Sequence, residues 1–151
     1  MKYQQILDCS IADGEGVRVV LFVTGCSHRC KGCHNPECWD ANNGKEFTQE
    51  TKQKIFDLLN RDYIDGLTLS GGDPLYLTNR DEIRNLVKEV KMKFPTKTIW
   101  LYTGYKYELI SNIDILDYVD VVVDGKFEIE QRDITLPFRG SKNQRIIRLR
   151  G

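Results

Sequence analysis

The chain alternates short apolar runs rich in β-branched residues with segments of helical periodicity, and this alternation limits its fold more than any other feature. The run over 17–24 (VRVVLFVT) is almost continuously apolar, as in a strand buried on both faces. Further strands are predicted over 64–70, 98–103, 118–123 and 144–149. Strands that alternate with helices indicate a parallel sheet with right-handed crossovers. We therefore expect an α/β fold.

Two of the intervening helices have clear start signals. Thr48 can cap a helix that runs to about Asn60. Asn79, with Glu82 three residues later, forms a capping-box-like start for a second helix, whose apolar residues recur at helical spacing. A short helix is predicted between residues 105 and 117.

The length of 151 residues suits one domain, covering 1–151, with a core of its own. A closed eight-unit (β/α) barrel needs about 200 residues or more. We therefore expect an open, partial (β/α) barrel whose parallel sheet does not close on itself.

Charge and cysteine content exclude several classes of protein. The 22 Lys and Arg residues are matched by 22 Asp and Glu, which argues against nucleic-acid binding through bulk positive charge. No apolar run is long enough to span a membrane, and no secretory signal is visible after Met1. Four of the five cysteines lie between Cys26 and Cys38, and such crowding in an intracellular chain indicates metal ligands rather than disulfides. We expect a cytoplasmic protein.

Residues able to do chemistry follow each predicted parallel strand. Cys26 follows the first strand, Gly71-Gly72-Asp73 the second, Thr103-Gly104 the third and Asp124-Gly125 the fourth. Because parallel α/β folds place their sites at the carboxyl ends of strands, these loops should share one rim of the sheet.

The strongest candidate metal site is the triplet Cys26, Cys30 and Cys33. A cuboidal 4Fe–4S cluster usually takes four protein thiolates. Three thiolates would leave one iron with an open coordination position, where a substrate can bind.

Two other metal sites are compatible with these cysteines. One is a structural zinc site with Cys38, His28 or His34 as the fourth ligand. The other is an electron carrier whose cluster is completed by Cys38 or Cys9. We favour the open cluster over zinc, because zinc sites usually have two well-separated pairs of ligands and the chain has no second pair.

The C-x3-C-x2-C spacing, placed directly after the first strand of an alternating α/β chain, resembles the radical S-adenosylmethionine superfamily. Gly71-Gly72-Asp73-Pro74 resembles that superfamily's glycine-rich motif, although such a loop alone is more often a turn. The resemblance implies a 4Fe–4S cluster on the three cysteines, with the methionine part of S-adenosylmethionine on the open iron. An electron from the cluster would cleave the sulfonium to methionine and a 5′-deoxyadenosyl radical. The chain departs from the superfamily at Gly32, where an aromatic residue often precedes the third cysteine.

Further segments resemble the activating enzymes of glycyl-radical enzymes, and among these the activating proteins of anaerobic ribonucleoside-triphosphate reductases. The resemblance runs from about Tyr3 to Arg148. The segments that carry it are 13–18 (DGEGVR), 21–26 (LFVTGC), 32–35 (GCHN), Trp39, 69–75 (LSGGDPL), 100–105 (WLYTGY), 122–127 (VVDGKF) and 139–144 (RGSKNQ).

This resemblance implies a set of cofactor contacts on four loops, namely Gly32, Cys33, His34, Gly71, Gly72, Asp73, Thr103 and Asp124. The first three would form a backbone strip along the adenosine. The next three would hold the methionine ammonium, because glycines let main-chain carbonyls approach and a carboxylate favours positive charge. The last two would reach the ribose or the carboxylate. No protein acid–base pair is implied, since the chemistry occurs at the cluster.

The implied partner is the large catalytic subunit of the anaerobic reductase, on which the radical would be placed at a glycine near the C-terminus. A small reducing electron-transfer protein would supply the electron, and the assembly would be a homodimer or a complex with the reductase. Two alternatives are a small radical S-adenosylmethionine enzyme of modified-nucleoside synthesis and a non-enzymatic zinc or iron–sulfur interaction module.

Overall fold

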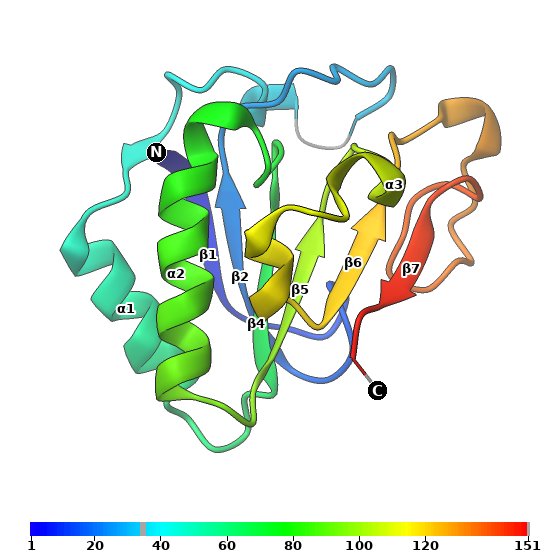
Figure 1. The fold of residues 1–151 in the computed structure, drawn as a ribbon. Coiled ribbons are helices and arrows are strands. Elements are labelled where there is room, and N and C mark those ends of the chain that lie inside the picture. The colour runs from blue at the N-terminus through cyan, green and yellow to red at the C-terminus, as the bar shows by residue number, and fades with distance from the viewer. Residues whose placement is uncertain (34–35, 151) are drawn as a thin grey trace.

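The computed structural model describes residues 1–33 and 36–150, and these residues contain one seven-stranded sheet with helices on it (Figure 1). The strands are β1 (Lys2–Ser10), β2 (Arg18–Val23), β3 (Lys45–Glu46), β4 (Gly66–Gly71), β5 (Thr98–Tyr102), β6 (Val121–Asp124) and β7 (Arg145–Arg148). The α-helices are α1 (Gln49–Leu59), α2 (Arg80–Lys93) and α3 (Tyr107–Ile110). Short 3-10 turns are η1 (Pro36–Cys38), η2 (Leu77–Asn79), η3 (Asp114–Tyr118) and η4 (Ile129–Gln131). None of the helices in this part of the chain has both the length and the apolar character needed to cross a membrane.

The central strands β2, β4, β5 and β6 run parallel, and antiparallel strands lie at both edges of the sheet. The order is β3-β1-β2-β4-β5-β6-β7, so the sheet has two free ends and does not close. This confirms the expected α/β fold with an open, partial barrel. The antiparallel β1 and β3 are additions that the sequence pattern does not predict, because the side chains of β1 are all exposed or only half-buried.

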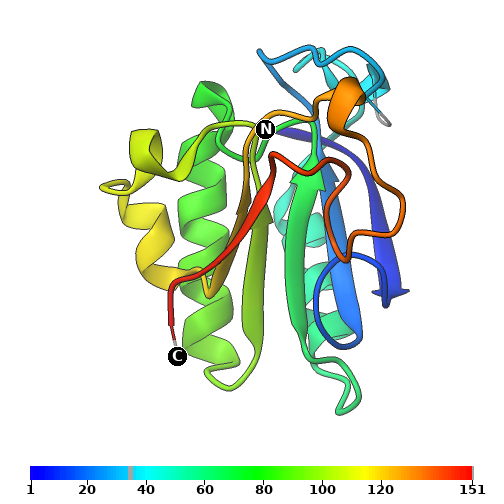
Figure 2. The same cartoon turned by 90° about the vertical axis from the view of Figure 1, so that its right-hand side faces the viewer.

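The two faces of the sheet are covered differently. The helices α1 and α2 pack on one face, over strand residues such as Val19, Leu67 and Ile99 (Figure 1). The chain segments 11–17 and 125–144 lie on the other side of the sheet from α2 (Figure 2). Within residues 1–33 and 36–150, the loops that can form a cavity over the strands therefore lie on the second face.

Arg18 fills the amino-terminal end of this second face and is fully buried. Its Nε donates to Thr68 Oγ1 at 2.8 Å, and its Nη1 donates to Thr98 Oγ1 and Glu15 O, both at 2.9 Å. The guanidinium carbon lies 5.7 Å from the ring centroid of Trp100. Burial lowers the pKa of Arg18 to about 10, so the side chain remains charged at neutral pH. The charge is tolerated because the guanidinium donors have acceptors around them.

The two predicted helix starts differ in outcome. Thr48 is the N-cap of α1, and it forms a capping box with Thr51. The prediction for Asn79 is confirmed in position, because α2 begins directly after it, but the capping box is absent, because Asn79 has helical dihedrals and its side chain makes no cap hydrogen bond. Its amide instead donates to Thr24 O at 2.8 Å and to Asp73 O at 3.3 Å. Asn79 thus connects the start of α2 to two loops at the carboxyl ends of the strands.

Candidate functional site

A cavity of about 400 Å³ lies at the carboxyl ends of the parallel strands, on the face opposite the helices. Its walls include Cys26 after β2, Gly71 and Gly72 at β4, Thr103 after β5 and Gly125 after β6. The loops that follow the four parallel strands therefore meet around one space.

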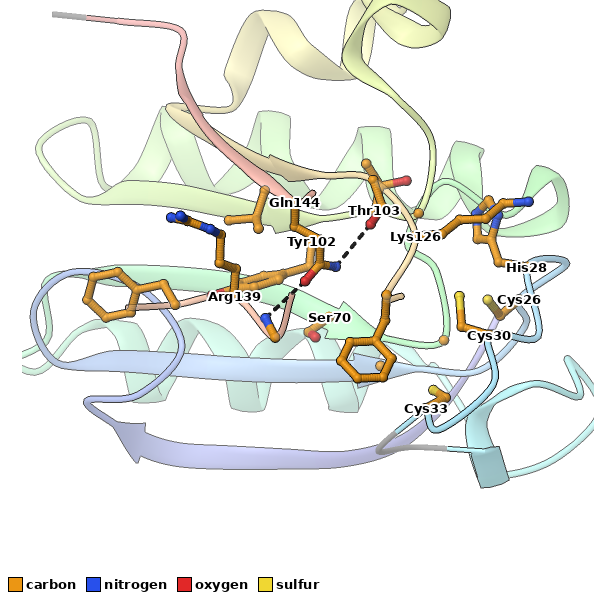
Figure 3. A pocket seen from close by; sticks show the side chains of 18 of the residues that line it. Cys26, His28, Cys30, Cys33, Ser70, Tyr102, Thr103, Lys126, Arg139 and Gln144 are labelled. Carbon is orange, nitrogen blue, oxygen red and sulfur yellow. Dashed lines mark hydrogen bonds between the residues drawn. The ribbon is translucent and has the colours of Figure 1, made fainter. Parts of the chain in front are cut away.

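All three cysteines of the triplet line one end of this cavity, and Arg139 and Gln144 lie towards the other end (Figure 3). Cys26, Cys30 and Cys33 do not form disulfides. The described residues contain no group of three or more His, Cys, Asp or Glu side chains placed to hold one metal ion. In a cuboidal cluster each thiolate binds a different iron, so its ligands do not converge on a single ion. Three soft sulfur donors at one end of a cavity fit a 4Fe–4S cluster.

Backbone N–H groups support the thiolate forms of two of these cysteines. Burial raises the pKa of the Cys26 and Cys30 thiols, and hydrogen bonds to the sulfur oppose that rise. The backbone N–H groups of His28 and Arg29 donate to Cys26, and that of Phe127 donates to Cys30. Such N–H···S hydrogen bonds stabilise the metal-binding thiolate and influence the reduction potential of an iron–sulfur cluster.

Cys38 and Cys9 lie outside this group. Cys38 is fully buried, its thiol donates to Gln4 Oε1 at 2.9 Å, and burial raises its pKa to about 11. Its carbonyl accepts the N–H of Gly25 at 2.7 Å, which holds the start of the cysteine loop. Cys9 is exposed on β1. Neither Cys38 nor Cys9 lines the cavity.

The two glycines of the second loop are required by close packing. A Cβ on Gly71 would lie 2.3 Å from Val23 O, and Gly71 has a φ of +110° that favours glycine. A Cβ on Gly72 would lie 2.5 Å from Cys38 O and 2.6 Å from Gly25 O. Only glycines bring this loop so close to the cysteine loop, and both residues border the cavity.

Asp73 is buried beneath the rim, with 1% of its surface exposed. Its Oδ2 accepts hydrogen bonds from His28 Nε2 at 2.7 Å, from Thr103 Oγ1 at 2.9 Å and from the N–H of Gly104 at 2.9 Å. Its Oδ1 accepts the N–H of Leu75 at 2.9 Å. Asp73 therefore joins the loops after β2, β4 and β5. Its side chain does not line the cavity, so it acts on the cavity only through the electrostatic effect of its negative charge.

His28, which the sequence suggests only as a possible fourth ligand of a zinc site, is a side-chain partner of Asp73. Its ring packs edge to face on Tyr105, with centroids 4.7 Å apart. A Cβ on Gly104 would lie 2.4 Å from the His28 ring, so glycine is required there. His28 thereby fastens the cysteine loop to the loop after β5. The pairing joins residues 45 positions apart, and no local sequence signal indicates it.

The remaining predicted contacts occupy different surroundings. Thr103 lines the cavity. Gly32 has a φ of +79° and packs beside Phe127. Asp124 is buried, accepts the N–H of Tyr107 at 2.7 Å and pairs with Arg145, so its carboxylate is engaged in holding α3 and β7. His34 lies outside the described residues.

Gln144 is a cavity residue that sequence reasoning does not select as a contact. Its Oε1 accepts the N–H of Gly140 at 2.9 Å, and its Nε2 donates to Gly125 O at 3.0 Å (Figure 3). These bonds close the segment 125–144 over the sheet. The run 139–144 carries part of the family resemblance, which is the only signal that could have drawn attention to it.

Similarity to known proteins extends over nearly the whole chain. Residues 12–147 match the family described as "4Fe-4S single cluster domain". Three similar proteins are each named anaerobic ribonucleoside-triphosphate reductase-activating protein. The one from Enterobacteria phage T4 is 53% identical over 146 residues, covering 97% of this chain and 93% of the relative. That of Vibrio cholerae is 44% identical and covers 98% of both chains. That of Escherichia coli K12 is 40% identical, covering 99% of this chain and 100% of the relative.

Proposed function

Because this chain belongs to the family of anaerobic ribonucleoside-triphosphate reductase-activating proteins, which carry a 4Fe–4S single cluster domain, we propose that it installs a glycyl radical on the large catalytic subunit of such a reductase. The observation that supports this most directly is the position of Cys26, Cys30 and Cys33 at one end of a cavity bordered by Gly71 and Gly72.

The cysteine loop fits a cluster with one open iron. Its three thiols line the same end of the cavity, and N–H groups donate to two of the sulfurs. Cys38, which is also buried, is bonded to Gln4 instead. When bound, the cluster and S-adenosylmethionine would supply the one-electron chemistry that removes a hydrogen atom from a glycine Cα of the reductase.

The other residues of the cavity would hold and shield the cofactor. The carbonyl groups around Gly71 and Gly72 would accept hydrogen bonds from the methionine ammonium, and the buried charge of Asp73 would favour that cation. Gly32, Cys33 and Thr103 would contact the adenosine and its ribose. Lys126, which also lines the cavity, is a cation that could pair with the methionine carboxylate.

A protein substrate needs access to this space. A hollow of about 800 Å³ adjoins the cavity and shares His28, Gly104, Gly125 and Lys126 with it. We propose that a glycine-bearing loop of the large subunit enters there, and that a small reducing electron-transfer protein serves the cluster from outside. The assembly would be a homodimer or a complex with the reductase.

The test begins with anaerobic reconstitution using iron and sulfide. We expect about four irons per chain. The reduced protein is then mixed with S-adenosylmethionine and the large subunit, and electron paramagnetic resonance should record a glycyl-radical doublet on that subunit. A colourless protein with one zinc per chain would contradict the cluster. A fully loaded, reduced protein that yields no glycyl signal would contradict the activating role.

Cysteine variants test the ligand set separately. Cys26→Ala, Cys30→Ala and Cys33→Ala should each lose cluster iron and the release of 5′-deoxyadenosine. Cys9→Ala and Cys38→Ala are the matched controls and should retain both, because their sulfurs do not face the cavity. If Cys38→Ala lost its iron, the assignment of Cys26, Cys30 and Cys33 as the full set of protein ligands would be wrong.

A further inference from the structure

His28 joins a proposed ligand of the cluster to the buried network around Asp73. Its backbone N–H donates to the sulfur of Cys26. Its ring Nε2 lies 2.7 Å from Asp73 Oδ2, and the two side chains have only 6% and 1% of their surface exposed. One residue therefore contacts the sulfur through its main chain and the buried carboxylate through its side chain.

The Asp73 end of this link is held in place by other groups. Its Oδ2 also accepts from Thr103 Oγ1 and from the N–H of Gly104, both at 2.9 Å, and its Oδ1 accepts the N–H of Leu75. The His28 ring is confined as well, because a Cβ on Gly104 would lie only 2.4 Å from it. The carboxylate is therefore a fixed point to which the cysteine loop is attached.

The backbone of the cysteine loop is not held by local preference alone. Arg29, which follows His28, has a φ of +48°, in the left-handed region that residues other than glycine rarely adopt. The N–H of Arg29 also donates to the Cys26 sulfur. Both N–H groups thus reach the sulfur from a conformation that the chain does not favour locally, and the bond of the His28 ring to Asp73 opposes its relaxation.

Hydrogen bonds to a ligand sulfur affect how readily an iron–sulfur cluster is reduced. One-electron reduction adds a negative charge, which the cluster shares with its thiolates. Backbone N–H donors stabilise the more negative form more strongly, because hydrogen bonds to charged acceptors are the stronger ones. Loss of N–H groups from the Cys26 sulfur would therefore make the reduction potential more negative.

We propose that the hydrogen bond from His28 to Asp73 raises the reduction potential of the cluster, by holding two backbone N–H groups at the sulfur of Cys26. His28 is then a positioning residue for the electron-transfer step, because it acts through Cys26. The inference rests on the cluster ligation of the proposed function, in which the electron comes from the small reducing protein.

The test measures the potential without turnover. Reconstituted wild type, His28→Leu and His28→Gln are titrated anaerobically with a chemical reductant, without S-adenosylmethionine or reductase, and the reduced cluster is followed by electron paramagnetic resonance. His28→Leu keeps the three thiolates and should take up about four irons per chain. Its equilibrium constant for reduction should fall by about tenfold, which places the midpoint about 59 mV lower. His28→Gln should stay within about twofold of wild type, because its amide nitrogen can take the place of Nε2 and donate to Asp73.

Thr103→Val is the matched control. It removes another donor from the same oxygen of Asp73, but this donor belongs to the loop after β5 and not to the cysteine loop. Its reduction constant should stay within about twofold of wild type, because no hydrogen bond to a sulfur changes.

Each of the other outcomes contradicts a stated part of the proposal. A wild-type potential in iron-loaded His28→Leu would overturn the inference, as would an equal shift in Thr103→Val. A shift that His28→Gln does not reverse would assign the effect to the imidazole itself, and not to its bond with Asp73. If His28→Leu were unfolded or took up no iron, the link would hold the loop together without tuning the cluster, and the inference would again be wrong. Wild-type protein that binds no four-iron cluster would contradict the proposed function instead.

Discussion

At the scale of single residues, the rim of the cavity depends on one buried carboxylate. Asp73 accepts hydrogen bonds from His28, Thr103, Gly104 and Leu75, which belong to three different loops. A carboxylate suits this position because it only accepts, and all four partners can donate to it. The family resemblance implies that Asp73 contacts the cofactor, and its position beneath the rim indicates a structural role as well.

Asp73→Asn tests this structural role. The fixed N–H groups of Gly104 and Leu75 donate to different oxygens of Asp73, and an amide has only one oxygen, so one of these N–H groups would face the NH2 group. Leaving one buried donor without an acceptor should lower the free energy of unfolding by about 1–3 kcal/mol. Urea unfolding of the cluster-free protein measures it. Asp62→Asn, at an exposed position, is the control and should change stability by less than about 0.5 kcal/mol. Equal stability of the two variants would mean that Asp73 is not the centre of this network.

Cys38 gives a prediction on pH. Burial raises the pKa of its thiol from 9.0 to about 11, so the folded protein keeps a proton that the unfolded chain loses. Stability from this group is complete below about pH 9 and is lost as pH rises towards 11. The free energy of unfolding of the cluster-free protein should therefore fall over this range, and less steeply in Cys38→Ala. Parallel pH profiles of the two proteins, measured by urea unfolding, would contradict the raised pKa.

At the scale of elements, the central strands and the long helices are predictable and their connections are not. The run over 17–24 and the periodicity after residue 80 report local preferences, which the structure confirms as β2 and α2. Asn79 shows the limit. An asparagine before an amphipathic segment predicts a cap, but its amide is bonded to Thr24 O, 55 residues away. Contacts of that separation leave no local sequence pattern, and β1, with its half-buried side chains, is missed for a similar reason.

Asn79→Ala and Thr48→Ala separate these two kinds of helix start. Removing the Thr48 cap should destabilise α1 by about 1 kcal/mol and leave the site intact. Removing the Asn79 amide takes its donor from Thr24 O and one of two donors from Asp73 O, which should lower the free energy of unfolding by about 1–3 kcal/mol. Because those carbonyls belong to site loops, Asn79→Ala should also take up less iron on reconstitution. Iron analysis and urea unfolding check both variants, and full iron uptake by Asn79→Ala would contradict the link to the site.

At the scale of the whole molecule, the general position of the site is predictable and its walls are not. Parallel strands fix the carboxyl-end rim, so residues such as Cys26 and Gly72 meet there as strand order requires. The walls of the cavity are formed by segments 11–17 and 125–144. Neither segment has the periodicity of a helix or a strand, so its sequence does not indicate where it lies in the fold. Their placement depends on bonds between residues far apart in the sequence, such as that of Gln144 to Gly125 O, 19 positions away. Only the folded chain therefore reveals Phe127 beside the cysteines.

The buried side chain of Arg18 connects the loop before β2 with two strands of the sheet. One guanidinium bonds the loop before β2 through Glu15 O, strand β4 through Thr68, and strand β5 through Thr98. Replacing it by methionine keeps much of the buried volume and removes every donor. Several buried acceptors then lose a charged partner at once, which should lower the free energy of unfolding by about 3 kcal/mol or more.

Urea unfolding of Arg18→Met, with Lys54→Met at an exposed position of α1 as the control, tests this. The control should stay within about 0.5 kcal/mol of wild type. Arg18→Lys should recover only part of the loss, because an ammonium cannot reach acceptors spread around a planar guanidinium. If Arg18→Met were instead as stable as wild type, apolar packing against Trp100 would be what holds the loop, β4 and β5 together, and the guanidinium would be dispensable.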